Sequence, residues 1–94
     1  NYRMVTYLWY SCFFYFMKKQ DIGNIELEKL AKRIKSLRIK KGYSNYETFA
    51  YDNDLPRAQY GRYEQGQDLR YTSLIKVVKA LGVTMEEFFS EGFD

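Results

Sequence analysis

Residues 54–66 read DLPRAQYGRYEQG and hold the signals for one short, complete helix. Pro56 is favoured at the first position of a helix, because its missing N–H would be unpaired there in any case. The closing glycine is a typical helix-ending residue. These signals predict a helix over residues 56–65, in which Tyr60 and Tyr63 are three positions apart and share the buried face. The exposed face is then small, polar and basic.

A longer helix is predicted before this segment, over residues 25–41, because its apolar residues recur three and four positions apart. They are Leu27, Leu30, Ile34 and Leu37. Between Lys29 and Lys41 the chain holds seven basic residues and no acid. Such a run is either a solvated helix face or a surface for an anionic partner, and the charge pattern alone does not separate the two.

A short helix is predicted between these two, over about residues 45–51. Ser44 and Glu47 have the S-x-x-E spacing of a capping box, in which the serine hydroxyl accepts from an N–H of the first helical turn. The following residues 52–54, Asp-Asn-Asp, end the helix, because Asn and Asp tolerate the left-handed backbone of a tight turn. A tight turn between two helices is therefore expected here.

Two more helices are predicted after the segment. One runs over about residues 72–81, with Thr72 or Ser73 as its cap and apolar residues at helical spacing. The other begins after Thr84, which is followed by the T-x-x-E spacing of another capping box. The expected fold class is all-α: a compact five-helix domain over residues 21–94.

The composition of the chain excludes most catalytic chemistry. The sequence has no histidine and a single cysteine, Cys12. A histidine-based triad, a histidine general base and a Cys/His zinc site are therefore excluded. We expect neither an enzyme nor a bound metal or cofactor. One cysteine allows no internal disulfide, which favours a reducing, cytoplasmic location. The net charge of +3 is compatible with a nucleic-acid partner without establishing one.

Residues 1–20 differ in composition from the rest of the chain. The first sixteen, NYRMVTYLWYSCFFYF, are apolar and aromatic and carry one charge, Arg3. The apolar run is shorter than the about 20 residues of a membrane span, and it lacks the small-residue cleavage site of a secretory signal. A membrane role is therefore not expected. Two interpretations stay open: sequence upstream of a native start at Met17, or an arm that pairs with another subunit through its strand-forming residues.

Residues 30–89 resemble the XRE family, the Cro and phage-repressor type of helix-turn-helix proteins. The matching stretches are IKSLRIKKGYS at 34–44, FA at 49–50, the helix at 57–66 with its YEQG ending, and LIKVVKALGVTMEEFF at 74–89. The resemblance implies a λ-repressor-like fold and a sequence-specific transcriptional regulator of double-stranded DNA. It further implies that the helix over 56–65 enters the major groove and that the protein is a dimer without a small-molecule cofactor.

The resemblance also assigns roles to residues. The base-reading positions are occupied by Arg57, Ala58, Gln59 and Arg62, and the phosphate-binding positions by Asn45, Tyr46 and Arg70. The first set suits its role, because arginine binds guanine, glutamine binds adenine and alanine contacts the thymine methyl. Tyr46 has a second interpretation, as a core residue. Arg38 and Glu64 occupy positions that form a salt bridge in the family, so we expect them to join the helices at 25–41 and 56–65.

Three departures from the family pattern affect the docking on DNA more than the fold. GYSNYETFA at 42–50 is one residue longer than usual, Asp54 replaces a turn glycine, and Pro56 replaces a Ser or Thr cap. A second hypothesis is a protein-interaction module on the same fold, such as an antitoxin or an assembly adaptor. The aromatic N-terminal segment favours such a protein partner. Loss of DNA binding on Arg57→Ala or Arg62→Ala would separate the two hypotheses.

Overall fold

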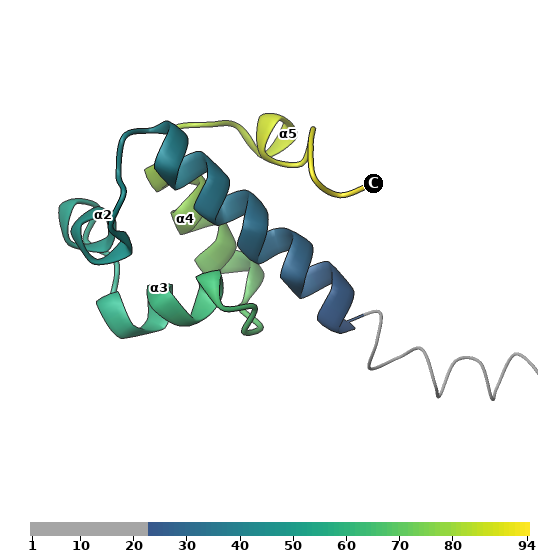
Figure 1. The fold of residues 1–94 in the computed structure, drawn as a ribbon, viewed down its shortest axis with the longest axis horizontal. Coiled ribbons are helices and arrows are strands. Elements are labelled where there is room, and N and C mark those ends of the chain that lie inside the picture. The colour runs from purple at the N-terminus through teal and green to yellow at the C-terminus, as the bar shows by residue number, and fades with distance from the viewer. Residues whose placement is uncertain (1–22) are drawn as a thin grey trace, which may run out of the picture.

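The computed structural model describes residues 23–94, which form five helices and no strand (Figure 1). The first, called the long helix below, spans residues 23–40. It is followed by α2 (Tyr46–Asp52), α3 (Arg57–Glu64), α4 (Tyr71–Leu81) and α5 (Met85–Phe88). The all-α fold expected from the sequence is confirmed for this part of the chain. The two interpretations of the aromatic N-terminal segment concern residues outside it.

The long helix is the central element of the arrangement. In Figure 1 it runs across α4, with α2 and α3 on one side and α5 with the C-terminal tail on the other. One apolar core joins all five helices. Its buried members are Ile34, Leu37, Phe49, Ala50, Tyr60, Tyr63, Leu74, Val77, Val78, Leu81 and Phe88. They recur at spacings of one, three and four residues, which turns one face of each helix toward the same volume.

The tight turn between α2 and α3 depends on one left-handed residue. Asp54 has a φ of 56°, and it is the non-glycine residue with positive φ in the described part of the chain. The N–H of Leu55 then donates to the carbonyl of Ala50 over 2.8 Å. Aspartate tolerates this conformation better than most residues, so the turn forms without the glycine that is usual in the family.

The first turns of the helices differ from the sequence prediction at three places. The N-cap of α2 is Asn45 and not Ser44, because its Oδ1 accepts from the N–H of Glu47 at 2.7 Å. Ser44 and Asn45 are adjacent, and asparagine caps as well as serine does. Pro56 is the N-cap of α3 rather than its first residue, with an extended ψ of 118°.

The cap of α4 was also predicted wrongly. Arg70 is its N-cap, without a side-chain hydrogen bond, whereas Thr72 and Ser73 were expected there. The helix therefore begins earlier than the capping signals indicate. By contrast, the Thr84 cap of α5 is confirmed, since its Oγ1 accepts from the N–H of Glu87 at 3.0 Å. Among the described helices, none combines the length and the apolar character that a membrane span requires.

Candidate nucleic-acid interface

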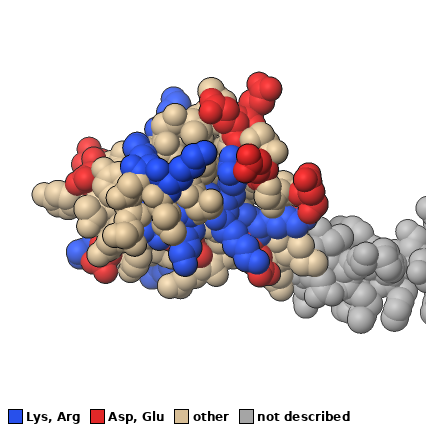
Figure 2. Space-filling view, turned by 45° about the horizontal axis from the view of Figure 1, so that its top comes forward, with Lys and Arg blue, Asp and Glu red and all other residues tan. Residues whose placement is uncertain are grey.

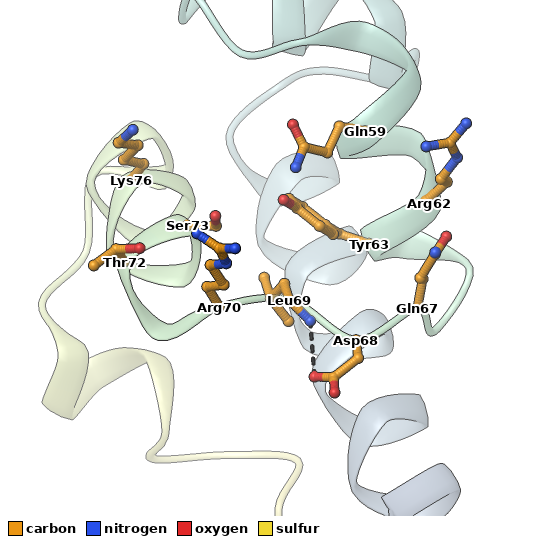
Figure 3. A pocket seen from close by; sticks show the side chains of 10 residues that line it. All are labelled: Gln59, Arg62, Tyr63, Gln67, Asp68, Leu69, Arg70, Thr72, Ser73 and Lys76. Carbon is orange, nitrogen blue, oxygen red and sulfur yellow. Dashed lines mark hydrogen bonds between the residues drawn. The ribbon is translucent and has the colours of Figure 1, made fainter.

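The middle of the exposed face of α3 is formed by Ala58 and Arg62. These residues are four positions apart, so they lie along one line of the helix, opposite the buried Tyr60 and Tyr63. Both are exposed. Arg62 forms no ion pair in the described part of the chain, and its side chain points away from α4 (Figure 3). A cationic side chain is thus free on the outer side of a helix that the core holds from behind.

Arg57 lies on the side of α3 that is nearest to α2. Its Nη1 is 3.4 Å from Oε2 of Glu47, which lies in the first turn of α2. The N-cap residue, Pro56, has no side-chain group that could accept from the first N–H groups of α3. Arg57 is thus the first residue at the positive end of the α3 macrodipole.

Gln59 lies on the other side of α3, nearest to α4. It lines a hollow of about 480 Å³ between the two helices and the loop that joins them. Figure 3 shows the side chains of Gln59 and Tyr63 on the α3 side of this hollow, with Ser73 and Lys76 on the α4 side. Three of the four predicted base-reading residues therefore have different directions. Arg57 is directed toward α2, Arg62 outward, and Gln59 toward α4.

The hollow is positively charged. Its lining includes the cationic side chains of Arg62, Arg70 and Lys76 and one carboxylate, that of Asp68. Oδ1 of Asp68 accepts from the N–H of Leu69 at 2.8 Å, so the carboxylate is bound to the loop backbone. The three cations form no ion pair among the residues described. An anion that approaches between α3 and α4 would meet an excess of positive charge.

The start of α2 places Asn45 and Tyr46 beside α3. The side-chain oxygen of Asn45 serves as the helix cap, which leaves its amide N–H groups as donors. Tyr46 is 37% exposed, and its ring lies against Gly61 of α3. A Cβ atom on Gly61 would come within 2.8 Å of Cε2 of Tyr46. The close approach of α2 to α3 therefore depends on a residue without a side chain.

Arg38 and Glu64 lock α3 to the long helix. Nε of Arg38 donates to Oε2 of Glu64 at 2.7 Å, and Nη2 donates to Oε1 at 3.0 Å. Tyr60, which is 1% exposed, lies nearby, and its hydroxyl has no hydrogen-bond partner among the described residues. Burial, aided by the neighbouring carboxylate of Glu64, raises the pKa of Tyr60 well above its ordinary value of 10.0. The phenol therefore keeps its proton in the folded protein at a pH above 10.0 at which an exposed tyrosine would begin to lose it.

Most of the basic run on the long helix has structural partners. On the face seen in Figure 2, lysine and arginine side chains form a continuous group across the middle. Arg33 donates to the carbonyls of Phe88 and Glu87, both at 2.8 Å, and so holds the end of α5. Lys41 donates to the carbonyl of Ala80 near the end of α4. Cations near these helix ends complement the negative end of the macrodipole.

Three more of the seven basic residues form ion pairs, which are Lys29 with Glu26, Lys32 with Glu28, and Arg38 with Glu64. Five of the seven thus have partners within the chain, and the run mainly connects the long helix to its neighbours and to its own surface acids. Tertiary contacts involve three of the seven, Arg33, Arg38 and Lys41. Lys35 and Lys40 of the run form no ion pair among the described residues, and neither do Arg62, Arg70 and Lys76 beside α3 and α4.

The geometry is that of a helix-turn-helix protein, in which a short helix is presented to DNA by a packed bundle. A family model described as helix-turn-helix matches residues 34–88. The chain belongs to the XRE type of this family and is a DNA-binding regulator. The control protein C.MunI of Mycoplasma sp is 33% identical over 64 residues, which are 67% of this chain and 86% of that protein. No solved structure matches the chain significantly.

Two features of the site were missed by sequence reasoning. Lys76 joins Arg70 at the hollow, and Glu47 contacts Arg57. Helical spacing places Lys76 four residues after Thr72 on one face of α4, but nothing in the sequence says which helix that face meets. Glu47 was interpreted only as part of a capping box. Its pairing across the turn depends on the angle between α2 and α3, which the sequence does not reveal.

Proposed function

We propose that the chain is a sequence-specific regulator that reads double-stranded DNA with α3 in the major groove. The observation that carries this proposal is the outer face of α3. Arg62 and Ala58 are exposed there, while Tyr60 and Tyr63 anchor the opposite face in the core. A major groove about 12 Å wide admits one helix. The Arg38–Glu64 pair supports the role, because it fixes the helix that must fit the groove.

Each base-reading residue has a chemical role in this proposal. Arg62 and Arg57 donate to the O6 and N7 atoms of guanine, Gln59 pairs with adenine, and Ala58 contacts a thymine methyl group. These side chains leave α3 in different directions, so they reach different base pairs. Arginine in particular suits bidentate contacts because its donors have a fixed planar geometry.

The phosphate contacts are proposed on both flanks of α3. Asn45 and Tyr46 flank it at the start of α2, and Arg70 flanks it in the loop before α4. The excess positive charge of the hollow supports adding Lys76 to this set. Contacts of this kind position the protein on the duplex and carry no sequence information.

The regulator is proposed to act as a dimer. One helix reads only a few base pairs, and two-fold symmetric sites pair naturally with two-fold symmetric proteins. Phe89 supports a contact surface at α5 and the tail, since it is 43% exposed and its ring centroid lies 4.8 Å from that of Phe93. Phe88 is excluded from that surface because it is fully buried. The name of the relative, control protein, agrees with a regulatory role.

A selection experiment tests DNA reading. Fluorescence anisotropy is measured against random duplexes at several salt concentrations, and the bound fraction is sequenced. We expect a defined motif, and Arg62→Ala should relax it at one or two bases. Lys29→Ala is the matched control, because it removes a cation that pairs with Glu26 on the long helix. Absence of binding even at low salt, where phosphate contacts are strongest, would contradict DNA reading and favour the protein-interaction module.

A sedimentation experiment tests the dimer separately. We expect the mass of a dimer for the wild type, and a monomer for Phe89→Asp, because a buried unpaired carboxylate opposes association. Tyr51→Asp is the matched control, since Tyr51 is 80% exposed and lies at the end of α2. A dimer that survives Phe89→Asp would place the contact elsewhere in the chain.

A further inference from the structure

The ion pair between Glu47 and Arg57 lies at the edge of the proposed DNA-reading face. Nη1 of Arg57 is 3.4 Å from Oε2 of Glu47, and the two side chains are 66% and 51% exposed. An exposed pair contributes little to stability, because water and salt screen it. The pair joins the first residue of α3 to the first turn of α2. The pair should therefore affect a molecule that binds near the starts of α2 and α3 more than it affects folding.

Glu47 is held on a rigid support. Its backbone N–H donates to the cap oxygen of Asn45 at 2.7 Å. The residue between them, Tyr46, places its ring against Gly61 of α3, where a Cβ would come within 2.8 Å of Cε2. The carboxylate is therefore attached to a backbone whose distance from α3 is fixed by packing. A long arginine side chain loses conformational freedom when such a neighbour accepts from it.

A carboxylate beside a DNA-reading helix has two opposite effects. It lowers the affinity for every duplex, because it faces a chain of phosphates. It also leaves the remaining donors of Arg57 available, since the contact with Glu47 uses only Nη1. Guanidinium carries five N–H donors in a planar fork, and the bidentate contact with guanine needs two of them. The same acid thus directs the arginine toward guanine and weakens binding to every duplex, and only a guanine at that position offsets the loss.

We propose that Glu47 is a positioning and specificity-determining residue: it directs Arg57 to guanine and weakens binding to duplexes that lack guanine at that position. The proposal rests on the proposed function, in which α3 enters the major groove. Its distinctive consequence concerns the ratio of specific to non-specific affinity. Removing the acid should strengthen non-specific binding while the preference for guanine falls.

The test compares Glu47→Gln and Glu47→Ala with the wild type on the selected motif, on that motif with each base changed in turn, and on a scrambled duplex. Glu47→Gln removes the charge but keeps an oxygen that accepts from Arg57, whereas Glu47→Ala removes both. The matched control is Glu28→Gln, which breaks a comparable exposed pair with Lys32 on the long helix. Circular dichroism verifies that each variant is folded.

We expect both Glu47 variants to bind the scrambled duplex several-fold more tightly, with a salt slope steeper by about one ion. Glu47→Ala should lose about tenfold in its preference for guanine at one base, and Glu47→Gln should lose less. In an Arg57→Ala background, changing Glu47 should leave that preference as it is. The Glu28→Gln control should bind scrambled and selected duplexes with an unchanged ratio.

Two results would overturn the proposal, and they differ from each other. If Glu47→Ala raises the affinity for all duplexes by one factor, Glu47 is only a charge near DNA, and the reading role of α3 stands. If the wild type selects no motif, or if its motif is unchanged in the variants Arg57→Ala and Arg62→Ala, the proposed function itself fails and the role of Glu47 fails with it.

Discussion

Arg38 of the long helix and Glu64 of α3 form a buried ion pair with two hydrogen bonds, and their side chains are 5% and 9% exposed. Arg38 also donates through Nη1 to the carbonyl of Tyr43 at 2.8 Å. One guanidinium therefore connects the long helix, the loop before α2, and α3. Because α3 is the proposed DNA-reading helix, the stability of the fold and the orientation of that helix depend on the same contact.

Replacing Glu64 by alanine should lower the free energy of unfolding by about 3–5 kcal/mol, because it leaves the charge of Arg38 buried without a counterion. Urea unfolding followed by circular dichroism measures the loss. The double variant Arg38→Met, Glu64→Leu is the control and should lose much less, since apolar residues carry no charge to strand. A loss within about 0.5 kcal/mol for Glu64→Ala, the range of ordinary surface changes, would contradict the structural role.

Replacing Tyr60 by phenylalanine should leave the protein as stable as the wild type or more stable by up to about 1 kcal/mol, since the buried hydroxyl has no partner. The replacement should also change how the free energy of unfolding depends on pH. The pKa of Tyr60 is raised in the folded state above 10.0, so folding favours the protonated phenol.

The contribution of the protonated Tyr60 phenol to the free energy of unfolding is complete below pH 10.0. It is lost as the pH rises further, because the unfolded chain then releases the proton while the folded chain keeps it. Stability measured from pH 9 upward should therefore fall less steeply for Tyr60→Phe than for the wild type. A marked loss of stability at neutral pH in this variant would show instead that the hydroxyl makes a hydrogen bond.

Replacing Asp54 by glycine should raise the free energy of unfolding by roughly 0.5–1 kcal/mol, because glycine adopts a positive φ without the steric penalty of a Cβ atom. Asp54→Ala is the comparison at the same position and should be destabilising, since alanine lacks the local hydrogen bonding that helps aspartate. Thermal unfolding of the wild type, Asp54→Gly and Asp54→Ala ranks the three proteins by stability. If glycine and alanine had equal effects, the φ of 56° would not control the turn.

Replacing Gly61 by alanine should destabilise the protein although alanine favours helices by about 1 kcal/mol over glycine. The new Cβ would meet the Tyr46 ring at 2.8 Å and push α2 away from α3. In a Tyr46→Ala background the same change should become stabilising, because the clash is gone and the helix propensity remains. A double-mutant cycle measures this change of sign, and additive effects would contradict the contact.

Replacing Arg70 or Lys76 by alanine should weaken DNA binding about equally for selected and scrambled duplexes. Each variant should lower the salt dependence of binding by about one ion, as expected for a lost phosphate contact. Titrations at four or more salt concentrations give the slope, with Lys29→Ala as the control. A changed base preference with an unchanged slope would mean that these side chains read bases.

The sequence alone determined the features that depend on neighbours along the chain. The apolar residues at helical spacing on the long helix and α4, the tight turn at residues 52–54, and the Thr84 cap all follow from local chemistry. Capping signals were less reliable, because Asn45 lies beside Ser44 and caps equally well. Local rules cannot choose between two adjacent caps, and so the start of α2 was displaced by one residue.

Only the tertiary structure decided which charges are available to a partner. In the sequence the run from Lys29 to Lys41 is the largest basic feature, yet most of it binds acids and helix ends within the fold. The free cations beside α3 come from segments that are separate in sequence, namely Arg62, Arg70 and Lys76. Charge interacts through space, so its availability depends on the angles between packed helices. The pair of Glu47 and Arg57, ten residues apart across a turn, exists for the same reason.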